Sequence, residues 1–113
     1  EAQQAQVRAQ LAFVTIGIMT QTLIPKIRGG RVLAMEILVG TPAIKALIRD
    51  DKIHQIYSMI QAGKKYGMQT MNQALFDLYK KKEIDLKSMM SASRDPAELE
   101  QMLGEFRQAQ GIK

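Results

Sequence analysis

Cysteine and tryptophan are absent from the chain, and histidine occurs once, as His54. Without cysteine the chain has no disulfide framework, no thiol nucleophile and no cysteine-ligated zinc site, and a cytoplasmic location is favoured. His54 has no carboxylates at ligand spacing around it, because the adjacent Asp50 and Asp51 would point in different directions on a helix. We therefore expect a structural or solvent-facing histidine and no metal site.

Aromatic residues and long apolar runs are also scarce. Aromatic residues make up 5% of the 113 residues, which argues against a base-stacking surface for nucleic acid. No apolar run approaches the roughly 18 residues that span a bilayer, and the first residues lack the basic-then-apolar order of a signal peptide. The chain begins with Glu1 rather than methionine, which suggests a processed or excised polypeptide.

The formal charge of +5 and the pI near 9.6 raise the question of an acidic partner. The basic residues fall into three short groups, each beside a turn or at the end of a predicted helix: Lys26, Arg28 and Arg31; Lys64 and Lys65; Lys80, Lys81 and Lys82. Solvated faces and helix C-termini account for such groups, so we expect no nucleic-acid partner. A small basic helical interaction or nucleic-acid-binding module remains the alternative function.

Strand and turn signals follow an N-terminal helical pattern. One apolar face at helical spacing, formed by Val7, Leu11, Val14 and Ile18, predicts a helix over residues 4–18. Residues 20–27 and 31–39 are rich in β-formers, and the Gly29-Gly30 step between them predicts an antiparallel hairpin. Pro25 cannot donate to a ladder, so the first strand should lie at an edge or carry a bulge.

The second predicted strand is apolar on both faces apart from Glu36. Such a strand is typical of a sheet that is covered on both sides, and an isolated hairpin would be marginally stable. We therefore expect burial on both faces and a larger sheet than this chain contains.

Helical signals replace the strand pattern after Gly40. Thr41 and Pro42 provide an N-cap and a first-turn proline, and the apolar stripes continue through residues 53–60. Thr70, Asp85 and Asp95 should cap three further helices. The sequence thus predicts an N-terminal helix, an antiparallel hairpin and a bundle of about five helices.

The residue patterns of common catalytic sites are missing. The Gly63-Lys64 step is followed by Lys65 and ends a predicted helix, whereas a P-loop lies between a strand and the helix that it opens. There is no Gly-x-Ser-x-Gly elbow, and no carboxylate pair suggests acid and base catalysis. The chain by itself is therefore predicted to be non-catalytic.

Several segments together resemble a known family. These are GIMTQTLIPK (17–26), GRVLAMEIL (30–38), AIKALIRD (43–50), KIHQIY (52–57) and YGMQTM (66–71). In this order they are similar to the C-terminal part of the type IV pilus retraction (twitching motility) ATPases, the PilT family. The resemblance extends over residues 4–103.

The resemblance implies an α+β piece of a RecA-like α/β motor domain. Residues 1–40 would form the C-terminal edge of the RecA-like core, and residues 41–113 a helical C-terminal subdomain. The family's Walker A, Walker B, Asp-box and His-box segments would lie upstream, which accounts for the missing P-loop. The resemblance further implies a parent that binds ATP and Mg, forms a hexameric ring, and works in the cytoplasm with the pilus machinery at the inner membrane.

The resemblance also assigns a candidate site. Residues Ala43, Ile44, Lys45, Ala46, Leu47, Ile48, Arg49 and Asp50 correspond to the family's Ala-Ile-Arg-Asn-Leu-Ile-Arg-Glu motif, which the family needs for retraction. Lys45, Ala46 and Asp50 depart from the motif, and lysine cannot reproduce the planar two-pronged donor of arginine. We expect the Ile/Leu stripe to be buried, and Lys45, Arg49 and Asp50 to face outward. Related assembly and secretion ATPases carry a four-cysteine module, whose absence here favours the retraction branch.

Overall fold

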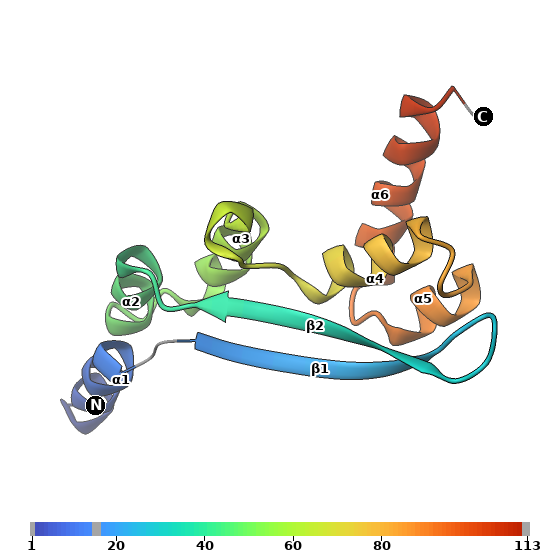
Figure 1. Cartoon of the computed structure of the whole chain (residues 1–113). Helices are drawn as coiled ribbons and strands as arrows, with labels where there is room; N and C mark the ends of the chain where they lie inside the picture. The colour runs from blue at the N-terminus through green and yellow to red at the C-terminus, as the bar shows by residue number, and fades with distance from the viewer. Residues whose placement is uncertain (1, 15–16, 112–113) are drawn as a thin grey trace. The chain divides into compact units, whose positions relative to one another are not determined.

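The computed structural model describes residues 2–14 and 17–111 (Figure 1). The elements are α1 (Ala2–Val14), β1 (Gly17–Pro25), β2 (Arg31–Val39), α2 (Pro42–Arg49), η1 (Ile53–Gln55), α3 (Ile56–Gln61), η2 (Lys64–Tyr66), α4 (Met71–Lys80), α5 (Leu86–Ala92) and α6 (Pro96–Ala109). An N-terminal helix, a hairpin and five further α-helices therefore follow one another in the predicted order. None of the helices in the described part is long and apolar enough to cross a membrane.

The border between the first helix and the first strand differs from the prediction. The helix ends at Val14, and the strand already begins at Gly17, so Ile18 belongs to β1. β-Branched residues such as Ile18 and Thr20 fit a pleated strand better than a last helical turn, and here this preference overrides the helical spacing. Val7, which belongs to the predicted apolar face of this helix, is exposed. Residues 15 and 16 and the side chains of Leu11, Val14 and Ile18 lie outside the described part.

The hairpin closes through a short glycine turn. The Gly29 N–H donates to the Lys26 carbonyl at 3.1 Å, and the Lys26 N–H donates to the Gly30 carbonyl at 2.9 Å. Gly29 and Gly30 have φ values of 96° and 74°. These values suit glycine because it has no Cβ to clash with the backbone, so the Gly-Gly step determines where the chain reverses.

The second strand is not buried on both faces, so that expectation was wrong. Ala34 is buried, whereas Leu33 on the opposite face is 39% exposed. The physical reason is that the described sheet consists of β1 and β2 alone, and the buried face is the one covered by helices. Gln69 adds a single antiparallel bridge to Ile37, and its side-chain amide donates to the Met35 carbonyl at 2.7 Å.

The contacts of the chain define two compact units, which we describe separately. Unit 1 comprises residues 1–20 and 35–70, and unit 2 comprises residues 21–34 and 71–113. The buried core of unit 1 consists of Ile44, Ile48, Ile60 and Met68, with Leu38, Val39, Ile56 and Met59 packed around it. The expected domain border between residues 40 and 41 remains a prediction.

Unit 2 has a larger core, in which α4, α5 and α6 pack together on the turn half of the hairpin. Its buried residues are Ile24, Ala34, Ala74, Leu75, Phe76, Ile84, Met89, Leu99 and Leu103. The rings of Phe76 and Phe106 meet edge to face, with their centroids 5.6 Å apart. This geometry fixes α6 against α4.

A buried amide organises the start of α6. The Asn72 side chain donates to the Asp95 carbonyl at 3.2 Å and to Glu98 Oε1 at 2.7 Å, and it accepts from the Ser93 hydroxyl at 2.6 Å. These bonds replace the water that Asn72 loses on burial, so the polar group is tolerated in the core.

Three of the predicted helix starts are confirmed by cap hydrogen bonds. The side chains of Thr41, Asp85 and Asp95 accept from the backbone N–H groups of Ile44, Ser88 and Glu98 at 3.2, 2.7 and 3.3 Å. Each bond satisfies a donor that the first turn of a helix otherwise leaves unpaired.

The Asp85 cap should make the stability of unit 2 depend on pH. The backbone N–H and the hydroxyl of Ser88, with a smaller contribution from Lys87, hold the pKa of Asp85 below the ordinary value of 3.8. A lowered folded pKa gives stability that is complete above the unfolded pKa and is lost as pH falls through the folded pKa. We expect the gap in Tm between the wild type and Asp85→Ala to be constant near neutral pH and to shrink in acid.

Circular dichroism melts across this pH range measure that gap. Asp85→Asn is the matched control, because asparagine caps helices without titrating in this range. A gap that stayed constant in acid would show that the charge of Asp85 contributes nothing.

Candidate functional site

The candidate motif lies on α2, whose start and rotation are both determined locally. Thr41 caps the helix and Pro42 occupies its first turn, where the missing N–H has no cost. Ile44 and Ile48 lie one turn apart and are both buried in the core of unit 1. This apolar stripe anchors α2 and fixes which of its side chains reach solvent.

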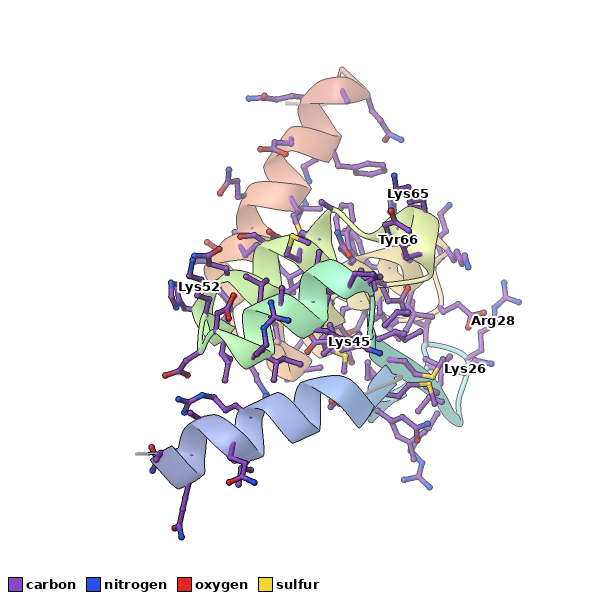
Figure 2. The ribbon with its side chains drawn as sticks, turned by 90° about the vertical axis from the view of Figure 1, so that its left-hand side faces the viewer. Lys26, Arg28, Lys45, Lys52, Lys65 and Tyr66 are labelled. Carbon is purple, nitrogen blue, oxygen red and sulfur yellow. The ribbon has the colours of Figure 1, made fainter. Side chains whose placement is uncertain are left out.

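The other motif residues divide into half-buried and exposed positions. Lys45, Ala46 and Leu47 are half-buried, and Ala43 is exposed. The expected burial of the Ile/Leu stripe is confirmed for Ile44 and Ile48, whereas Leu47 is only half-buried. Lys45, which was expected to face outward, is half-buried. Figure 2 labels Lys45 beside the ribbon of α2.

Arg49 and Asp50 are the exposed end of the motif, as predicted. The Arg49 Nε donates to Asp50 Oδ1 at 3.4 Å, and the two side chains are 60% and 51% exposed. An exposed pair of this kind adds little stability. The contact uses one of the five guanidinium donors, so the planar pair of terminal nitrogens can still receive a carboxylate.

The C-terminus of α2 forms a Schellman motif without glycine. The Asp51 N–H donates to the Ile48 carbonyl at 3.3 Å, and the Lys52 N–H donates to the Leu47 carbonyl at 2.8 Å. Asp51 occupies the left-handed position with φ of 58°. Aspartate tolerates this conformation better than most residues, although less well than glycine. The motif sharply reverses the chain, so that Asp50 and Asp51 meet different partners.

Asp51 connects α2 to the N-terminal helix. Its Oδ2 lies 3.8 Å from Arg8 Nη1, and α1 packs against α2. The Arg8 Nε is buried and has no hydrogen-bond partner among the described residues. Sequence reasoning missed this contact, because the two residues lie far apart in the chain and no local pattern relates them.

The other two features considered in the sequence, His54 and the Gly63-Lys64 step, form neither a metal site nor a phosphate-binding site among the described residues. His54 is exposed, and no three metal-ligating side chains converge within residues 2–14 and 17–111. Gly63 lies between α3 and η2, where a Cβ would come within 2.5 Å of Met68 Cε and 3.0 Å of the Met59 carbonyl oxygen. Glycine is therefore needed at this position for packing rather than for phosphate binding.

Asp51 provides a test of the geometry at the end of α2. Asp51→Gly should leave stability unchanged or raise it by up to about 1 kcal/mol, because glycine relieves the left-handed strain and the lost ion pair is exposed. Asp51→Ala should cost about 1 kcal/mol, because alanine tolerates the left-handed conformation less well than aspartate and also loses the ion pair. Urea unfolding measures both, with Asp50→Ala as the control for charge. Equal losses for glycine and alanine would show that the ion pair dominates.

Comparison with known proteins gives a consistent result. No protein-family model matches the chain. The type IV pilus retraction ATPase PilT of Pseudomonas aeruginosa is 45% identical over 94 residues, which are 83% of this chain and 27% of that protein. A twitching motility protein of Neisseria gonorrhoeae is 44% identical over 73 residues, which are 64% of this chain and 20% of that protein.

A solved structure agrees with these relatives. The crystal structure of the pilus retraction motor PilT with bound ADP superposes with a TM-score of 0.78 at 52% identity, over 88% of this chain and 27% of that chain. The resemblance expected from the sequence is confirmed, and so is the fold class, an α+β part of a RecA-like α/β domain. The chain spans only about a quarter of the length of the PilT proteins that it matches.

Proposed function

We propose that this chain, which is homologous to part of the type IV pilus retraction ATPases, is the C-terminal portion of such a motor. In the complete protein it would couple ATP-driven domain movement to pilus disassembly and twitching motility. The observation that carries the proposal is the 45% identity over 94 of the 113 residues. A match of that length has to include the candidate motif at residues 43–50.

The nucleotide chemistry is assigned to the rest of the protein. The related motor structure holds ADP, whereas the sequence of this chain contains no P-loop. Residues 1–40 would complete the edge of the RecA-like core, and residues 41–113 would form the helical subdomain. ATP and Mg would then bind upstream of this chain, in a cytoplasmic hexameric ring that meets the pilus machinery at the inner membrane.

The uncovered side of the hairpin supports a larger sheet. Met19, Leu23 and Leu33 are exposed in the described structure. Apolar strand residues left in water are unfavourable, and an isolated pair of strands is marginal. The missing part of a RecA-like core would cover this surface.

The motif on α2 is suited to transmit movement. Its buried stripe fastens the helix to the core of unit 1, so the helix moves with that core. Arg49 and Asp50 lie on the outside and carry both charges of an exposed pair. A neighbouring subunit or the pilus machinery can exchange partners with this pair at low cost, because the pair itself is weak.

The motor assignment predicts a longer natural protein. Its reading frame should encode a P-loop upstream of residue 1, and the natural polypeptide should be several times heavier than 12.7 kDa. The 113-residue chain alone should hydrolyse no ATP, whereas the complete protein should do so. A natural product of this small size that bound DNA with a steep salt dependence would instead support the basic nucleic-acid-binding module.

Arg49 tests the role of the motif. In the complete protein, Arg49→Ala should keep ATP hydrolysis within about twofold of the wild type, because no reacting group is touched, and should abolish retraction. ATPase assays and twitching on agar measure the two effects. Lys52→Ala, a nearby exposed cation, is the matched control and should retain twitching. Normal twitching in the Arg49 variant would remove this residue from the mechanism.

A further inference from the structure

The fold joins two basic segments that are far apart in the sequence. The Ile27 N–H, at the hairpin turn, donates to the Glu83 carbonyl, in the loop between α4 and α5, at 3.0 Å. Figure 1 shows the hairpin turn beside this loop. The basic residues of the turn and of the loop therefore share one end of unit 2. We call this the basic turn surface, formed by Lys26, Ile27, Arg28, Arg31, Lys81 and Lys82.

Four of the five cations of the basic turn surface are exposed, and two of the carboxylates near them have partners. Arg28, Arg31, Lys81 and Lys82 are all exposed, and Figure 2 shows the Arg28 side chain extending away from the ribbon. Asp77 lies 3.5 Å from the Lys80 Nζ, and Asp85 caps α5. Glu83 is half-buried in the loop. The surface consequently carries a clear excess of positive charge.

An exposed apolar residue, Ile27, lies among these cations. Ile27 is 58% exposed and stands between Lys26 and Arg28 at the tip of the hairpin. Leu86, at the start of α5, is also exposed. An exposed isoleucine at a turn tip, flanked by long flexible cations, can enter a hydrocarbon layer while the cations remain at its polar boundary.

Lys82 occupies a position at which glycine would be favoured. It has φ of 62°, and its N–H donates to the Tyr79 carbonyl while the Glu83 N–H donates to the Leu78 carbonyl, both at 3.0 Å. This is a second Schellman motif, with lysine at its left-handed position. Lysine is strained there, and an outlier of this kind suggests a use for the side chain.

We propose that the basic turn surface binds the surface of an anionic lipid bilayer. An exposed hairpin turn with several cations around the exposed Ile27 side chain fits a fluid, negatively charged layer. Nucleic acid fits less well, because the turn from Lys26 to Arg31 has no aromatic side chain to stack on bases and no amide side chain to read them. This binding would not depend on the motor role, so its failure would leave the ATPase proposal intact.

Vesicle sedimentation of the 113-residue chain tests the proposal. The wild type should bind vesicles that contain phosphatidylglycerol and should not bind pure phosphatidylcholine. The variant Arg28→Gln/Lys81→Gln/Lys82→Gln should bind at least about tenfold more weakly, because each cation contributes about fivefold at an anionic surface. The matched control Lys52→Gln/Lys64→Gln/Lys65→Gln removes the same charge from exposed residues of unit 1 and should lose less than about threefold.

The contribution of the apolar Ile27 side chain to binding distinguishes a lipid bilayer from other polyanions, which have no hydrocarbon layer. Ile27→Ser should weaken vesicle binding about tenfold at unchanged charge, because the side chain that enters the hydrocarbon layer is lost. Ile53→Ser, at another exposed isoleucine, is the control and should have little effect. Three results would overturn the proposal: no vesicle binding at low salt, equal losses in the two triple variants, or an unchanged Ile27→Ser variant. Tighter binding to duplex DNA through the same cations would assign the surface to nucleic acid instead.

Discussion

The burial of Ile44 and Ile48 is the constraint on which unit 1 and its candidate site depend. These two side chains lie one helical turn apart, so burying both leaves α2 a single rotation about its axis. Arg49 and Asp50 then have to face solvent, and Lys45 is held half-covered. The exposed charges of the motif are thus a consequence of the apolar stripe, and a residue that loosened the stripe would also disorder the charges.

Helix ends determine much of the remaining architecture. Side-chain caps start α2, α5 and α6, and Schellman turns without glycine end α2 and α4. Each of these turns directs a charged residue outward, Asp51 toward Arg8 and Lys82 toward solvent. Two left-handed positions therefore carry charged side chains that glycine could not provide: Asp51 contacts Arg8, and Lys82 belongs to the proposed basic turn surface.

In the proposed motor, this chain would transmit movement, and other parts of the protein would perform the chemistry. Its cores are apolar, and the buried Asn72 side chain in unit 2 is engaged in structural hydrogen bonds. The charges gather instead on turns and helix ends at the surface. This distribution agrees with the proposed division of work, in which ATP is bound elsewhere in the protein and this portion presents surfaces to other components.

The sequence by itself determined the elements whose signals are local. Thr41, Asp85 and Asp95 mark helix starts because a short side chain reaches its own first turn. Gly29-Gly30 marks the hairpin because glycine adopts both positive-φ positions without strain. The quoted motifs also indicated the resemblance to PilT that the comparisons confirm. Tertiary structure alone decided the contact of Arg8 with Asp51, the exposure of Leu33, and the meeting of the hairpin turn with the loop after α4. These features join residues distant in the chain, and no local periodicity records which distant face a side chain will meet.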